Sequence, residues 1–176
     1  MAKSFIQIGD HGFWAQDRFI EAMQLCLIHE IEQQHLDSTS WVMDYKEALA
    51  LESVPIMVGA RSMRLEAFLT TPERNALILS LIDAIVEKIE IDAHYFTAEN
   101  LYAFRRRALE ILAASKTIQF ANEQEFLAVL NRSRWQESPG ISAVKGRYQQ
   151  AFTLLRRLVN QELQTEVSSP INYWGF

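Results

Sequence analysis

Residues 71–91 read TPERNALILSLIDAIVEKIEI and carry the clearest helix signal of the chain. Thr71 is a suitable cap for a helix that begins at Pro72, and Glu73 places a carboxylate in the first turn, where the helix dipole favours it. Apolar residues then recur at helical spacing: Ile78, Leu81, Ile82, Ile85 and Ile89. Further apolar residues widen this stripe, so we predict a helix to about Ile91 at the centre of the fold.

The same spacing predicts the other helices. They span residues 13–36, 41–52, 98–114, 123–135 and 142–163, and a helical turn is expected at 64–69. Thr97 is a cap residue, and Asn122 with Glu125 resembles a capping box. Short connections between helices favour an all-α fold. We expect a single-domain bundle of about six helices over residues 1–176, with an N-terminal segment at 1–12 and an aromatic tail at 166–176.

Three short stretches contain β-favouring residues, namely 5–8, 56–58 and 118–120. Whether they form two or three very short strands attached to the bundle stays open at this point.

Residues 9–14 read GDHGFW and place two glycines, Asp10 and His11 before large aromatic residues. Glycine allows a positive φ and a short acidic side chain caps a helix, so we interpret the stretch as the turn before a helix that starts at Phe13. The catalytic alternative makes Asp10 and His11 an acid/base pair on a flexible loop. Adjacent residues point in different directions and no nucleophile motif accompanies them, which favours the structural interpretation.

Residues 29–35 read HEIEQQH and hold the densest set of metal-ligand side chains. Glu32 and His35 have the three-residue spacing that carboxylate-bridged di-iron bundles use, but those sites need two such pairs. We therefore expect a solvated polar face, with no metal or other cofactor, and keep Glu32 and His35 as the metal-site alternative.

Charge is distributed unevenly along the chain. Residues 1–99 carry a net charge of −9 and residues 100–176 a net charge of +4. Either the two halves neutralise each other across the bundle, or an acidic surface meets a basic protein. Acidic residues are frequent in the first two predicted helices: Glu21, Glu30, Glu32, Asp37, Asp44, Glu47 and Glu52. The second interpretation requires that these acidic side chains outnumber the ones that form ion pairs within the protein.

The tightest run of positive charge is Arg105, Arg106 and Arg107. Successive helical residues lie about 100° apart, so the three side chains do not form one patch. Arg105 falls beside the apolar stripe, where we expect it to pair with a carboxylate or to cover the core with its methylene groups. Because the chain is acidic overall, at −5, we do not expect a nucleic-acid partner.

Motifs typical of enzymes are missing from the sequence. It contains no glycine-rich phosphate loop, no G-x-S-x-G and no H-E-x-x-H, which disfavours an enzyme. The single cysteine, Cys26, lies in an apolar helical run and is expected to pack as a small hydrophobe. We find neither the apolar region of a signal peptide nor a run long enough to span a bilayer, and so expect a cytoplasmic protein without a membrane partner.

These observations favour a soluble helical protein-interaction module that binds a basic protein through an acidic surface. Inhibitors, immunity proteins and adaptors are such modules, an analogy that rests on charge alone. The candidate partner-binding residues are Trp41, Asp44, Tyr45, Glu47, Tyr173, Trp174 and Phe176. Whether the aromatic tail docks on its own bundle or on a partner stays open, as does a homo-oligomer. The alternative is an enzyme or a small-ligand or metal binder with a site near Asp10, His11, Glu32 and His35.

Overall fold

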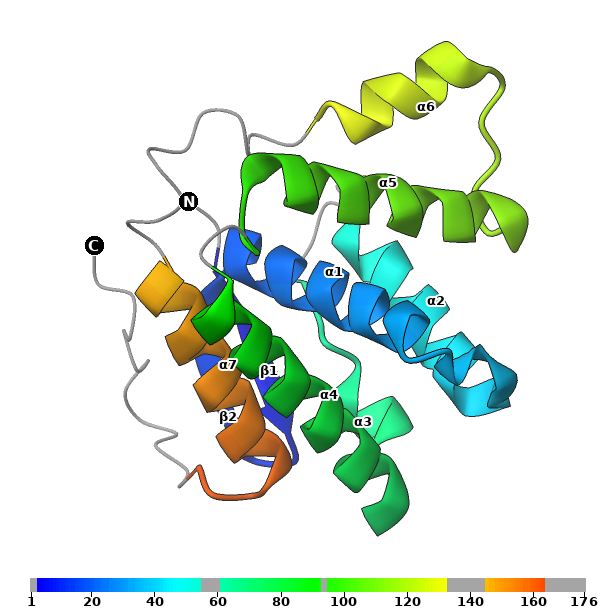
Figure 1. Ribbon diagram of the computed structural model, residues 1–176. Coiled ribbons are helices and arrows are strands. Elements are labelled where there is room, and N and C mark those ends of the chain that lie inside the picture. The colour runs from blue at the N-terminus through cyan, green and yellow to red at the C-terminus, as the bar shows by residue number, and fades with distance from the viewer. Residues whose placement is uncertain (1–2, 55–60, 93–94, 133–144, 164–176) are drawn as a thin grey trace.

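The computed structural model describes residues 3–54, 61–92, 95–132 and 145–163, and these are mainly helical, as predicted (Figure 1). Their α-helices are α1 (Asp17–Gln33), α2 (Ser40–Ser53), α3 (Leu65–Phe68), α4 (Pro72–Ile91), α5 (Ala98–Ala114), α6 (Glu123–Leu130) and α7 (Lys145–Val159). A 3-10 helix, η1 (Leu36–Ser38), separates α1 from α2, and strands β1 (Lys3–Ile8) and β2 (His11–Gln16) form an antiparallel pair.

The cap residues act as the sequence predicts. Thr71, Thr97 and Asn122 each accept a hydrogen bond from the backbone N–H three residues later, at 3.4, 3.1 and 2.9 Å. Helices α4, α5 and α6 accordingly begin at the predicted positions.

Three helices are shorter than expected, and α1 ends at Gln33 rather than near residue 36. Helix α6 ends at Leu130 rather than near residue 135, and α7 ends at Val159 rather than near 163. Beyond α7, Gln161 adopts a left-handed conformation with a φ of 58°, which is incompatible with continuing the helix. The predicted helical residues 133–135 and 142–144 lie outside the described part of the chain.

The N-terminal end is a β-hairpin, so the prediction of a helix starting at Phe13 is wrong. Phe5 pairs with Trp14 and Ile8 with His11, which leaves Gly9 and Asp10 as a two-residue turn. Phe13 is buried and Trp14 is exposed, and this alternation is the period of a strand. The helix itself begins at Asp17, four residues after Phe13.

Both glycines of this stretch are required by the hairpin. Gly9 has a φ of +58°, a conformation that side chains disfavour. A Cβ on Gly12 would lie 2.4 Å from the carbonyl oxygen of Ile6 and 2.6 Å from the ring of Phe5, which covers the strand at this point. The GDHGFW stretch therefore encodes a tight hairpin rather than a loop before a helix.

Of the three expected short strands, residues 5–8 are confirmed as part of β1, and 118–120 are not a strand. Lys116 is left-handed, with a φ of 63°, and the N–H of Ile118 then donates to the carbonyl of Leu112 at 3.2 Å. This segment closes the end of α5 instead of joining a sheet. Residues 56–58 lie outside the described chain.

Helix α1 is the centre of the fold, which corrects the prediction that residues 72–91 occupy it. Twelve of the seventeen residues of α1 are buried, whereas α4 buries five of twenty. Helices α2 and α5 contact each other, α4 and α7 contact each other, and α1 contacts all four, as its central position in Figure 1 shows. The hydrophobic pattern of the sequence did not predict the central position of α1, because three of its buried residues are polar: Glu21, Gln24 and Glu30.

Candidate functional site

Helices α1 and α5 are joined by two arginines of the run at 105–107, which leave α5 in different directions. Arg105 is 1% exposed, and its Nη1 lies 3.1 Å from Oε1 of Glu21 on α1. Arg61, on the segment before α3, binds the other oxygen of Glu21 from Nη2 at 3.1 Å. We call Glu21, Arg61 and Arg105 the inner network. The expected pairing of Arg105 with a carboxylate is confirmed.

The surroundings hold Arg61 in place. Its Nη1 donates to the carbonyl oxygen of Glu52 at 2.8 Å, and its backbone N–H donates to Oγ of Ser4 at 2.9 Å. Ser4, buried on β1, donates in turn to Asp17 at 2.8 Å. The inner network thus connects the hairpin, the start of α1, the end of α2 and α5.

Burial disfavours the charged form of Arg105 and lowers its pKa, an effect that the charge of Glu21 opposes and that of Arg61 reinforces. Nε and Nη2 of Arg105 are buried without a hydrogen-bond partner among the described residues. Oε1 of Gln24, one helical turn after Glu21, is likewise buried without a donor. Nearly all buried polar groups in proteins are paired, so these unpaired atoms are exceptions to the usual pattern.

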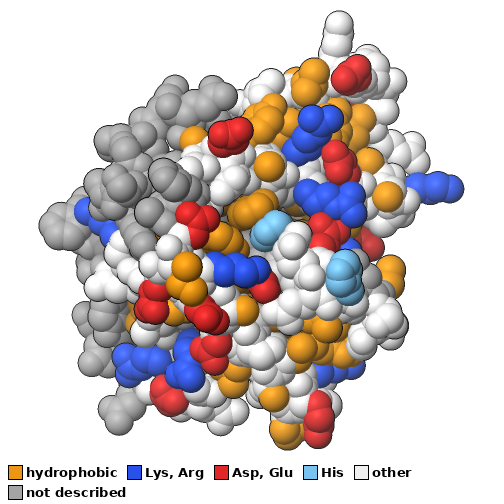
Figure 2. All heavy atoms as spheres, viewed as in Figure 1, with side chains coloured by type: hydrophobic (Ala, Val, Ile, Leu, Met, Phe, Trp, Pro, Cys, Tyr) orange, Lys and Arg blue, Asp and Glu red, His pale blue; other side chains and the backbone are white. Residues whose placement is uncertain are grey.

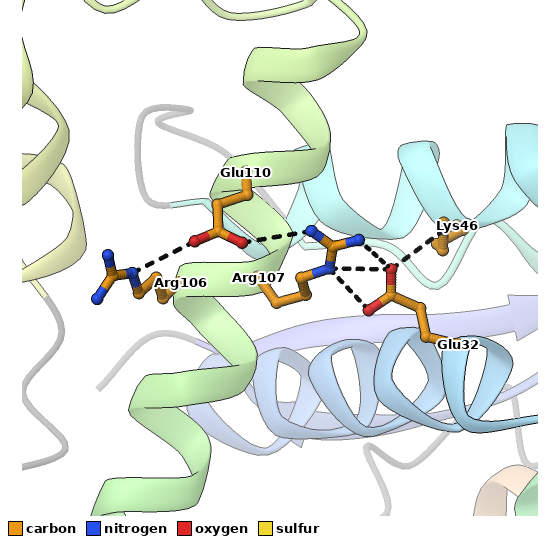
Figure 3. A network of polar contacts seen from close by, with 5 residues as sticks. All are labelled: Glu32, Lys46, Arg106, Arg107 and Glu110. Atoms are coloured by element: carbon orange, nitrogen blue, oxygen red, sulfur yellow. Dashed lines mark hydrogen bonds and ion pairs between the residues drawn. The ribbon is translucent and has the colours of Figure 1, made fainter.

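A second set of ion pairs lies at the other end of α1, near the surface (Figure 3). Arg107 donates from Nε to both oxygens of Glu32 at 3.0 Å, and Lys46 of α2 lies 3.3 Å from the same carboxylate. The carboxylate of Glu110 binds both Arg106 and Arg107, at 3.3 Å in each case. We call these five residues the outer network: Glu32, Lys46, Arg106, Arg107 and Glu110.

The metal-site alternative lacks the geometry on which it depends. Helix α1 ends at Gln33, and His35 lies beyond it with a left-handed φ of 54°, so Glu32 and His35 do not share a helical face. Glu32 is already paired with Arg107 and Lys46. Among the described residues, no group of three or more His, Cys, Asp or Glu side chains is placed to hold a metal ion.

The catalytic alternative places its residues at separate locations. Asp10 is exposed in the hairpin turn and His11 begins β2, at the bottom of Figure 1, whereas Glu32 and His35 lie at the far end of α1. The structure therefore does not bring the four residues together into one site.

Helix α2 turns its predicted partner-binding residues to different sides. Tyr45 is fully buried and donates to the carbonyl of Met63 at 3.2 Å, so its expected role as an exposed anchor does not fit the structure. Trp41 is half-buried, with the guanidinium carbon of Arg74 4.9 Å from its ring centroid. Asp44 is exposed and Glu47 is half-buried, accepting a hydrogen bond from Thr117. The tail residues Tyr173, Trp174 and Phe176 lie outside the described chain.

Part of the acidic excess of residues 1–99 is taken up by internal ion pairs. Glu21 and Glu32 bind Arg105 and Arg107 of the basic half, and Arg156 binds Asp83 at 2.7 Å. Further carboxylates bind cations of their own half, as Glu30 does with Lys88 at 2.5 Å. Acidic and basic side chains accordingly alternate on the face seen in Figure 2. These pairs match the interpretation in which the two halves neutralise each other.

Sequence reasoning missed Glu21, Gln24 and Arg61 as parts of one cluster. A signal was present in α1, where Glu21 and Gln24 lie three residues apart in an otherwise apolar run. Arg61 offered no such signal, because its approach to α1 depends on the tertiary fold. Cys26 packs as expected: it is fully buried, and burial raises the pKa of its thiol.

In the described parts of the chain, the helices are too short or too polar to traverse a bilayer. Comparison of the chain with protein-family models, curated proteins and solved structures finds no match.

Proposed function

We propose that the protein is a protein-interaction module that binds a basic partner through the outward face of α2. One observation carries the proposal. Met43 is 51% exposed on the same side of α2 as Asp44 and Glu47, two carboxylates that form no ion pair within the part of the chain that the structure describes. The two differ in this respect from five other carboxylates of the acidic half that bind Arg or Lys, namely Glu21, Glu30, Glu32, Glu52 and Asp83.

The three side chains lie on one side of α2. Positions 43, 44 and 47 follow the three- and four-residue spacing of a helix face, while Val42, Tyr45 and Leu49 occupy the buried face. Methionine adapts its shape to an apolar partner, and the flanking carboxylates attract Lys and Arg. A basic partner with an apolar anchor complements this face of α2.

The test is an affinity capture from the native host at low salt with three forms of the full chain. The wild type is compared with Asp44→Lys/Glu47→Lys and with a control of equal net charge, Glu87→Lys/Glu123→Lys, which changes exposed carboxylates elsewhere. The proposal predicts a basic protein that the wild type and the control retain and the α2 variant loses. Equal capture by all three forms, or no basic protein captured by the wild type, contradicts it.

Kinetics of the captured pair give a sharper criterion. Exposed charges mainly govern association, so raising salt from about 50 to 500 mM should slow association severalfold and leave dissociation nearly unchanged. Met43→Ala should accelerate dissociation, because it removes the apolar contact.

The hairpin offers a competing surface that the same assay distinguishes. Phe5 and Trp14 are each 37% exposed, and their ring centroids lie 5.3 Å apart on its outer face. Exposed aromatic pairs are frequent anchors of interfaces. If Trp14→Ala abolishes capture while the α2 variant does not, the partner binds the hairpin and the proposal for α2 is wrong.

A further inference from the structure

We propose that the unpaired edge of the Arg105 guanidinium, buried in the inner network, binds the carboxylate of a small ligand. This inference is independent of the function proposed for α2.

Only one nitrogen of the Arg105 guanidinium binds another described residue. Nη1 binds Glu21 at 3.1 Å, whereas Nε and Nη2 have no hydrogen-bond partner among the described residues. The N–H of Nε and one N–H of Nη2 are parallel in a planar guanidinium, and together they form a two-donor edge. This edge matches the two oxygens of a carboxylate, which it binds through parallel hydrogen bonds.

Burial makes the unpaired edge significant. Arg105 is 1% exposed, so bulk water does not solvate the free donors as it would on a surface. Leaving charged donors unpaired in such a place is costly, and an anion that binds there recovers that free energy. On a surface arginine, water would solvate the same unpaired donors, and they would not indicate a bound anion.

The charges around Arg105 leave room for one negative charge. The inner network itself contains two cations, Arg61 and Arg105, and one anion, Glu21. Its net charge is therefore +1. A monoanionic carboxylate neutralises this charge, whereas the dianion of inorganic phosphate, the main form at slightly alkaline pH, reverses it.

Arg18 adds a second cation with a free donor. It precedes Glu21 by one turn of α1, and its Nε is buried without a partner among the described residues. Its guanidinium carbon lies 4.9 Å from the ring centroid of Phe19, which orients the group. Arg18 is therefore a second cationic side chain of this end of α1 with a buried donor that no described residue satisfies.

The first experiment measures the melting temperature of the full chain in acetate, phosphate and chloride at matched ionic strength. At an acetate concentration ten times its dissociation constant, the melting temperature should rise by about 3 °C relative to chloride. Arg105→Lys keeps the charge but loses the two-donor edge, and should abolish the rise. Arg106→Lys, a change of the exposed neighbouring arginine, should retain it.

A second measurement needs no variant. In a ¹H–¹⁵N spectrum of the wild type, the Nε–H signal of Arg105, assigned through its own side-chain carbons, should shift on titration with acetate and not with chloride. Three results would overturn the proposal: no shift of this signal with acetate, an equal response to phosphate and acetate, or a full acetate effect on the melting temperature of Arg105→Lys. The first of these would mean that water alone occupies the edge.

Discussion

The inner and outer networks contain the same kinds of residues and join the same two helices, yet they differ in burial. Each pairs a glutamate of α1 with an arginine of the run at 105–107. The side chain of Arg105 is 1% exposed and that of Arg107 is 53% exposed. Two residues of separation along α5 therefore place one guanidinium in the core and the other in solvent.

The difference shows that burial, rather than the type of ion pair, decides what the pair contributes. Solvent screens the arginines of the outer network, whose side chains are 60% and 53% exposed, so the pairs they form with Glu110 gain little. The inner network has lost that solvation, and each of its charges depends on its partner. Removing one member should therefore have unequal consequences in the two places.

The largest expected effect follows from Glu21→Gln. The substitution leaves Arg105 and Arg61 without their shared carboxylate, and breaking a buried pair in this way typically costs about 3–5 kcal/mol of unfolding free energy. Urea denaturation followed by circular dichroism measures it. The matched variant Glu110→Gln in the outer network, whose partners Arg106 and Arg107 are exposed, should cost about 1 kcal/mol or less. Equal losses in the two variants would refute the distinction between the networks.

The sequence could predict part of this arrangement. The 100° spacing of helical residues separates Arg105 from Arg106 and Arg107. It correctly places Arg105 beside the apolar stripe of the helix, next to the core. The same reasoning failed for α1, because counting apolar residues ranks α4 above a helix that buries Glu21, Gln24 and Glu30. Buried polar residues are satisfied by tertiary partners, and a local pattern does not reveal those partners.

A smaller effect is expected from Arg107→Ala. The variant removes an exposed guanidinium that binds Glu32 and Glu110, and should lower the unfolding free energy by about 0.5–1 kcal/mol at low salt. In about 1 M NaCl the Debye length falls to about 3 Å, so most of this loss should vanish. The loss in Glu21→Gln should persist, since buried charges are screened much less. An Arg107→Ala loss that salt leaves unchanged would mean that its methylene packing, not its charge, stabilises the fold.

The candidate binding surface was also only partly predictable. Asp44 is exposed, as the acidic-surface hypothesis requires, but Glu47 is half-buried and Tyr45 is buried against the segment at Met63. Trp41 and Tyr45 have the same four-residue spacing as an exposed pair would have. Only the position of the neighbouring segment, which the sequence does not reveal, decides which face of α2 is covered.

The smallest effect concerns His29, which lies on α1 between the two networks. Its ring stacks on Phe104 with centroids 4.1 Å apart. Burial lowers its pKa from the usual value of about 6.5, and Lys88 lowers it further, while Glu30 and Glu32 oppose the shift. The folded state therefore binds a proton at His29 less readily than the unfolded state does. The stability contributed by neutral His29 is complete above about pH 6.5 and is lost as the pH falls through the lowered pKa.

The comparison of wild type with His29→Gln isolates this contribution, because the other titrating groups are common to both chains. Urea midpoints at pH 7.5 and 5.5 should fall further for the wild type than for the variant over this interval. The direction matters more than the size, since a half-buried imidazole retains part of its hydration. If the variant has the steeper decline, the carboxylates of Glu30 and Glu32 dominate over burial and Lys88, and His29 then belongs with the ion pairs of the outer network rather than with the core.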